Sequence, residues 1–119
     1  MRLNWVTIKV SDMEKSLHFY TQLLGLEVAA KFGGPEHQIV MLGKAEDAKV
    51  ELVFEPGAKT QNPGNGVSFG LETDNLDQLV ALLKEQGKAV SGPVAPNPGI
   101  RFFFVQDPDG YTVQLIEHK

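Results

Sequence analysis

The sequence predicts an α+β fold built from tandem βαβββ modules, which form a curved mixed sheet with the helices on its outer face. The first observation is a repeat: Glu51 lies 63 residues before Gln114, and Trp5 lies the same distance before Ser68 (114 − 51 = 68 − 5 = 63). The second is that each half opens with an alternating stretch, followed by an apolar stripe at helical spacing and a glycine. The third is that further alternating stretches, separated by turn residues, complete each half.

The first module begins with an alternating strand over residues 5–10. Ser11 and Glu14 have the spacing of a capping box, which predicts that a helix starts here. The helix is expected to bury an apolar stripe and to end at Gly25, and the stripe consists of Met13, Leu17, Tyr20 and Leu24. Three more strands are expected, with a Gly-Gly-Pro turn after the first, at residues 27–32, 38–42 and 49–54.

The second module repeats this plan with a strand over residues 67–73 and a helix that Asp74 or Asn75 can cap. The helix is expected to end at Gly87, and its apolar stripe consists of Leu76, Leu79, Val80 and Leu83. Residues 91–99, rich in Gly and Pro, are expected to form a loop between strands and a flap over any pocket.

Residues 55–66 are polar and rich in Gly and Pro, which is typical of a linker between two modules at about 1–56 and 66–119. A module of about 55 residues buries too little surface to be stable alone. The two modules are therefore expected to form a single domain over residues 1–119.

Composition excludes several classes of protein. With 119 residues, 42% hydrophobic and 22% charged, the chain has the composition of a globular domain, and its apolar runs are too short to span a membrane. A net charge of −4 without a basic cluster argues against nucleic acid binding. The absence of cysteine excludes disulfides and thiolate ligands. Because no signal peptide is recognisable at the start, a cytoplasmic location is expected.

Strand alternation sorts the strand residues onto two faces. The more apolar face must cover the two helices. Trp5, Glu51, Ser68 and Gln114 all belong to the opposite face, which is mixed in character. A concave and partly apolar surface with a few polar groups is typical of a small-molecule pocket. The alternative is that this face packs against a partner in a dimer.

Two segments carry a family resemblance: residues 10–20 followed by Leu24-Gly25-Leu26, and residues 104–111 with their Asp-Pro-Asp-Gly turn. Together with the repeated module, they resemble the vicinal oxygen chelate superfamily, which contains glyoxalases, bleomycin-resistance proteins, extradiol dioxygenases, methylmalonyl-CoA epimerase and fosfomycin-resistance enzymes. The resemblance covers essentially the whole chain and is closest to small bacterial glyoxalases.

The resemblance implies where a metal would bind. The metal-dependent relatives place two His and two Glu ligands at positions that match Trp5, Ser68, Glu51 and Gln114 here, and this chain keeps only Glu51. Indole has no usable lone pair, and a serine hydroxyl or an amide oxygen is a weak donor to Ni²⁺, Zn²⁺ or Fe²⁺. His18, His37 and His118 lack the spacing of a local metal clamp. The sequence therefore predicts that this chain has no metal and no other cofactor.

The function expected from these observations is metal-free binding of a small, partly apolar organic molecule by a homodimer. The expected ligand-binding residues are Trp5, Glu51, Ser68 and Gln114, together with Arg101 and Phe103 if the last hairpin turns them toward the pocket. One alternative is a metal-dependent glyoxalase-type lyase or isomerase with a rebuilt site, in which Glu51 would be the catalytic base. Another is a dimerisation or regulatory module without a ligand.

Overall fold

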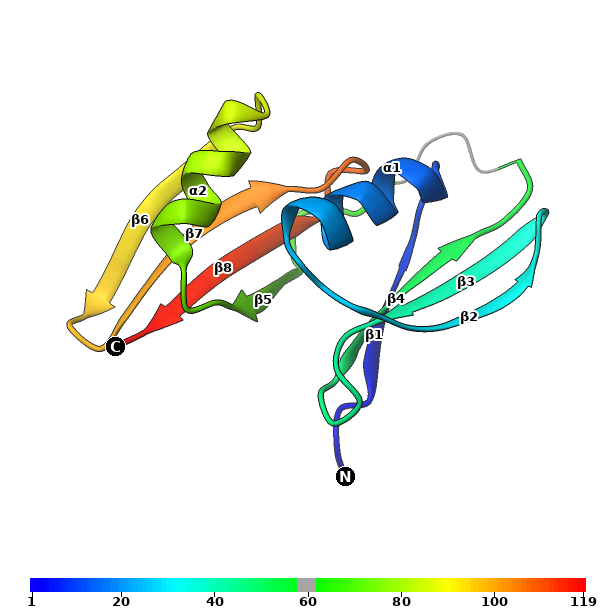
Figure 1. The fold of residues 1–119 in the computed structure, drawn as a ribbon, viewed down its shortest axis with the longest axis horizontal. Helices are drawn as coiled ribbons and strands as arrows, with labels where there is room; N and C mark the ends of the chain where they lie inside the picture. Colours follow the sequence, from blue (N-terminus) through cyan, green and yellow to red (C-terminus); the bar gives the residue numbers. More distant parts are fainter. Residues whose placement is uncertain (58–61) are drawn as a thin grey trace. The chain divides into compact units, whose positions relative to one another are not determined.

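A computed structural model describes residues 1–57 and 62–119. The chain divides into two compact units, Met1–Asn62 and Pro63–Lys119, and each unit contains one βαβββ module (Figure 1). The elements of the first unit are β1 (Trp5–Lys9), α1 (Met13–Leu17), the π-helix η1 (His18–Leu23), β2 (Val28–Gly34), β3 (His37–Leu42) and β4 (Lys49–Phe54). Those of the second are β5 (Ser68–Glu72), α2 (Leu76–Glu85), β6 (Val90–Asn97), β7 (Ile100–Gln106) and β8 (Thr112–His118).

Each unit has a four-stranded mixed sheet, and the two sheets have the same topology. The strand order is β1-β4-β3-β2 in the first unit and β5-β8-β7-β6 in the second. The first strand of each module pairs in parallel with the last, and the other pairs are antiparallel. The α+β fold with tandem βαβββ modules, predicted from the repeat, is confirmed. The predicted linker covers residues 55–66, of which residues 58–61 lie outside the described residues.

The first unit buries one face of its sheet and one side of its helix. Ile8, Leu42, Val50 and Leu52 are buried on the sheet, and α1 contacts β4. The N-cap is Asp12, whose carboxylate accepts a hydrogen bond from the Lys15 amide at 3.1 Å, so the predicted Ser11–Glu14 capping box is wrong. Capping one residue later suits the chain because an Asx side chain satisfies the same free amides.

The predicted apolar stripe of this helix is only partly correct. Met13 and Tyr20 are buried as expected, but Phe19 and Leu23 are buried where Leu17 and Leu24 were predicted. The reason is the π-helical turn over His18–Leu23, because an i→i+5 hydrogen-bond pattern shifts the buried side relative to that of an α-helix. The helix ends as predicted at Gly25, which has a φ of +81°.

The second unit buries the predicted stripe of α2 against its sheet. Leu76, Leu79, Val80 and Leu83 are buried, as are Val113 and Leu115 on β8. Figure 1 shows α2 lying over the strands of this sheet. The helix follows the predicted cap residue Asn75 and ends before Gly87.

The loop predicted at residues 91–99 is wrong, because most of it forms strand β6. Proline lacks the backbone N–H that a central strand needs, so Pro93 and Pro96 argued against a strand. The structure accommodates them because β6 is an edge strand with two register shifts against β7, one on each side of Val94. No flap is present among the described residues of this segment.

Among residues 1–57 and 62–119, there is no helix with the length and apolar character that crossing a membrane requires.

Candidate functional site

In each unit, the side of the sheet that does not pack against the helix is called the open face. In the first unit this face carries Trp5 and Glu51, the two candidate residues of this module. β1 runs parallel to β4, with Trp5 opposite Lys49 and Thr7 opposite Glu51. Across β3 and β2 the same face continues through Met41, which pairs with Glu51, and Ala30, which pairs with Met41. Trp5 and Glu51 thus share a face but lie two residues apart along the strands.

This face forms one wall of a groove of about 700 Å³. The strands contribute Trp5, Phe32, Met41 and Glu51, and the chain before β1 and the loop before β4 close the rim. Trp5 is 51% exposed and Phe32 is 58% exposed, although both are large aromatic side chains. The complete lining is Arg2, Leu3, Asn4, Trp5, Ala29, Ala30, Phe32, Met41, Ala45, Glu46, Asp47, Ala48, Lys49 and Glu51. The groove has the size and the mixed apolar and polar lining of a small-molecule site.

Glu51 has a defined hydrogen-bond partner that the sequence did not predict. The Thr7 hydroxyl donates to Oε1 of Glu51 at 2.5 Å. The nearest basic residue on β4, Lys49, directs its ammonium elsewhere, because Nζ donates to the backbone carbonyls of Ala45, at 3.2 Å, and Asp47. Thr7 could have been found from the sequence only if the parallel register of β1 and β4 had been known.

The open face of the second sheet carries Ser68 and Gln114. Ser68 pairs with Thr112, and Gln114 pairs with Gly70 on one side and with Phe104 on the other. Gly70 leaves room here, because a Cβ at this position would lie 2.5 Å from Cδ1 of Ile116 and 3.3 Å from Oε1 of Gln114.

The sequence did not predict two aromatic side chains of this face, Phe102 and Phe104. Phe104 lies beside Gln114, and its ring is perpendicular to that of Phe102, with 5.5 Å between the ring centroids. Because residues of a strand alternate, Phe102 and Phe104 share this face and Phe103 does not.

Arg101 and Phe103 lie on the other face of the sheet, so the condition under which they were expected to bind a ligand is not met. Phe103 pairs with Leu115 and is buried. Arg101 donates to Glu117 at 2.9 Å and to Asp77 of α2 at 2.8 Å. The hydrogen bond from Arg101 lowers the pKa of Asp77 below its usual range, and the same pair raises the pKa of Arg101. The register across the 107–110 turn, which the sequence left open, decides this.

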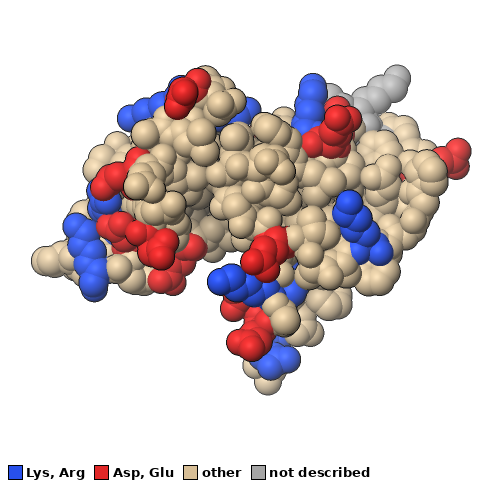
Figure 2. Space-filling model, in the orientation of Figure 1, with Lys and Arg blue, Asp and Glu red and all other residues tan. Residues whose placement is uncertain are grey.

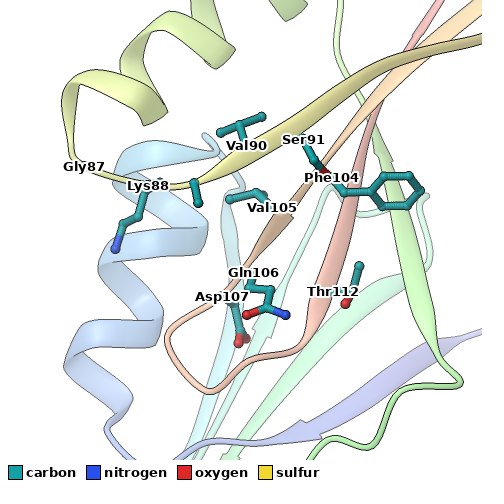
Figure 3. A pocket seen from close by; sticks show the side chains of 10 residues that line it. Gly87, Lys88, Val90, Ser91, Phe104, Val105, Gln106, Asp107 and Thr112 are labelled. Carbon is teal, nitrogen blue, oxygen red and sulfur yellow. The ribbon is translucent and has the colours of Figure 1, made fainter.

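A second hollow of about 610 Å³ lies in the second unit, at the end of β7 (Figure 3). Phe104 and Thr112 reach it from the open face, and its remaining lining is Gly87, Lys88, Ala89, Val90, Ser91, Val105, Gln106 and Asp107. Figure 3 shows the Lys88 side chain and the Phe104 ring on opposite sides of the hollow. Its cation and its aromatic ring therefore do not converge on one point.

The donor set does not fit the metal that the resemblance implies. In the first unit the matching positions hold an indole and a carboxylate that already accepts a hydrogen bond, and in the second a hydroxyl and an amide. Glu51 is the one carboxylate at these four positions, and none of the four is an imidazole, whereas such ions require several imidazole or carboxylate donors. Within the described ranges, no three His, Cys, Asp or Glu side chains gather to hold an ion. The three histidines are exposed, and His118 Nε2 lies 3.9 Å from Glu72.

The surface charge is mixed. Figure 2 shows acidic and basic side chains interspersed over the visible face, and the described residues on that face form no continuous basic patch. The visible face therefore lacks the electrostatic footprint of a phosphate-backbone binder.

The fold and the open strand faces define the class of protein. The family model described as Glyoxalase/Bleomycin resistance protein/Dioxygenase superfamily matches residues 2–115, and this chain belongs to that superfamily.

Individual relatives resemble the chain over its whole length. A lactoylglutathione lyase of Salmonella typhimurium is 32% identical, and the match covers 100% of this chain and 94% of that protein. The solved structure of TnmS3, an antibiotic binding protein from Streptomyces sp. CB03234, has a TM-score of 0.72 and 26% identity, covering 100% of this chain and 97% of that one. A V278E mutant of glyoxalase I from Zea mays has a TM-score of 0.84 and 26% identity, covering 97% of this chain and 44% of that one.

Proposed function

We propose that this chain binds a small, partly apolar organic molecule without a metal ion, in the groove on the open face of the first unit. The observation that carries the proposal is the exchange of a metal-ligand position for Trp5, a half-exposed aromatic side chain in that groove. An indole cannot coordinate a divalent ion, but it offers a flat apolar surface on which a ligand can stack.

The remaining groups of the groove support binding in place of metal chemistry. Glu51 lines the groove, but its Oε1 accepts the Thr7 hydroxyl, and within the described chain no imidazole lines the groove beside it. Phe32 and Met41 extend the apolar wall. On the open face of the second unit, Ser68 and Gln114 are proposed as neutral hydrogen-bonding groups at the positions that the repeat relates to Trp5 and Glu51.

Thermal unfolding with organic compounds and with metals tests the proposal. A compound present at 100 times its Kd should stabilise the protein by about 2.7 kcal/mol, which raises Tm by several degrees. We expect such a rise with at least one compound from a library of small aromatic molecules, and we expect Trp5→Ala to abolish it. Ni²⁺, Zn²⁺, Co²⁺ and Mn²⁺ should leave Tm unchanged. A rise that is selective for one metal and lost in Glu51→Ala would overturn the metal-free proposal.

The identity to relatives named lactoylglutathione lyase supports a second candidate function, a metal-dependent glyoxalase-type lyase or isomerase. It would need a site rebuilt from Glu51 and other donors. Its test is turnover of a hemithioacetal substrate by protein saturated in turn with the same four metals. Absence of turnover with every metal, in protein shown to be folded, would remove this candidate.

We also propose that the chain is a homodimer, because Leu3, Trp5 and Phe32 leave large apolar side chains exposed on one unit. Light scattering should give a mass near twice 13.1 kDa. The third candidate is a dimerisation or regulatory module. It would be favoured if Trp5→Ala lowered the mass to that of one chain and no compound stabilised the dimer.

A further inference from the structure

The charged residues that line the groove in the first unit leave it one net negative charge. Of the five charged residues that line the groove, Arg2 and Lys49 are basic, and Glu46, Asp47 and Glu51 are acidic. Arg2, Glu46 and Asp47 come from the chain before β1 and the loop before β4, whereas Lys49 and Glu51 lie on β4. Three acidic residues and two basic ones leave one net negative charge, and Glu51 is the acidic residue that lies on a strand of the groove wall.

Within residues 1–57 and 62–119, Glu51 forms no ion pair. The ion pairs of the described chain join Lys9 to Glu55, Arg101 to Asp77 and Glu117, and His118 to Glu72. Lys49 lies two residues from Glu51 on the same strand face, but its ammonium donates to backbone carbonyls of the loop before β4. The carboxylate of Glu51 is therefore available to a cation from outside the chain.

Thr7 fixes how that carboxylate is presented. Its hydroxyl donates to Oε1 from the adjacent position of β1, and a hydroxyl bound to an ionised carboxylate is among the stronger hydrogen bonds. With Oε1 held toward β1, Oε2 keeps its acceptor capacity for a ligand. Thr7 is itself exposed, so its side chain has no part in the core.

Trp5 lies close enough to contact a ligand group that is bound by Glu51. It shares the face with Glu51 but is displaced by one strand and by two residues. Strand dimensions make this about 5 Å across the sheet and about 7 Å along it. A cation placed between them can approach the carboxylate and an indole face together, and indole is the best aromatic partner for a cation.

We infer that the groove selects a protonated amine or other compact organic cation carried on a flat apolar body, and that Thr7 is a positioning residue for this selection. The inference rests on the proposed function and specifies its ligand class. Glu51 receives the cation, Trp5 and Phe32 receive the apolar body, and Thr7 holds Oε1 of Glu51. A carboxylate-bearing molecule of the same shape is disfavoured by the uncompensated charge.

The test is an NMR titration of the ¹⁵N-labelled full chain with three probes of one shape: 2-naphthylmethylammonium, 2-naphthylmethanol and 2-naphthoate. The chain has one tryptophan, so its single indole N–H signal reports on Trp5 directly. We expect the ammonium probe to bind with a Kd about tenfold lower than the alcohol, which corresponds to about 1.4 kcal/mol. The carboxylate should bind more weakly than the alcohol.

Variants assign this preference to residues. Glu51→Gln should bring the Kd values of the ammonium and alcohol probes within twofold of each other. Glu85→Gln is the matched control, because it makes the same change of charge at an exposed position of α2 outside the groove. Thr7→Val should reduce the preference about threefold, and Thr7→Ser should restore it.

The outcomes separate the inference from the function on which it rests. If ammonium and alcohol bind equally well to the unmodified chain, or if the preference survives Glu51→Gln, the cation selectivity is overturned while small-molecule binding stands. If Thr7→Val keeps the full preference, the positioning role of Thr7 is overturned. If no probe shifts the Trp5 indole signal, the inference fails, and the thermal-unfolding screen decides the proposed function separately.

Discussion

The β2–β3 hairpin carries Phe32 into the groove, and its turn depends on Gly33. β2 ends at Gly34 and β3 begins at His37, so Pro35 and Glu36 form a two-residue connection. Gly33 has a φ of +83°, a conformation that side chains other than glycine rarely adopt. A Cβ at this position would lie 2.0 Å from the carbonyl oxygen of His37. That atom belongs to the backbone of the hairpin and cannot rotate away.

Gly33→Ala should therefore destabilise the first unit strongly. The left-handed conformation costs an alanine about 1–2 kcal/mol. Relief of the contact with His37 requires a backbone shift, which costs about 1–3 kcal/mol, so we expect a total of about 2–5 kcal/mol. At about 4 °C per kcal/mol for a protein of this size, Tm should fall by about 8–20 °C.

Gly34→Ala is the matched control, one residue further along the same hairpin. No atom lies within 4 Å of a Cβ built at Gly34, and its φ is outside the left-handed region. Alanine there should change stability by less than about 1 kcal/mol. Urea unfolding of the two variants and the unmodified chain gives the comparison. If the two variants agree within 0.5 kcal/mol, which is about the error of such differences, the assigned role of Gly33 in the turn is wrong.

Two further predictions concern the second unit. The buried carboxylate of Asp107 accepts hydrogen bonds from the amides of Asp109 and Tyr111, both at 2.9 Å. Asp107→Ala should lower the free energy of unfolding in urea by about 2 kcal/mol, and Asp107→Asn should lower it less because it keeps an acceptor oxygen. Equal losses in the two variants would contradict the role of these bonds. Because Arg101 lowers the pKa of Asp77 from 3.8, the folded state binds this proton less readily than the unfolded state. The stabilisation by this pair should be present above about pH 4 and lost as the pH falls further. Asp77→Asn should accordingly lower Tm more at pH 7 than at pH 2.5, and a Tm difference that is the same at both pH values would refute this assignment.

Within the candidate site, the sequence predicted correctly on which face of a strand a residue lies where the prediction involved one strand alone. Glu51 was placed on the groove side by alternation along residues 49–54, and this strand has those bounds in the structure. For Arg101 and Phe103 the sequence left the face open, because it depends on how β7 is aligned with β8. One residue of register exchanges the two faces of a strand, and here it places Phe102 and Phe104 on the open face.

The sequence by itself determined the repeated βαβββ plan, the ends of the helices at Gly25 and Gly87, and the position of the candidate residues on each strand. These features are local, because periodicity, capping and turn residues act over a few positions of the chain. Only the tertiary structure decided the partner of Glu51, the exposure of Trp5 and the salt bridges of Arg101. Each of these depends on which residues of other strands and helices are brought alongside, and Thr7 and Glu51 are 44 residues apart in the chain.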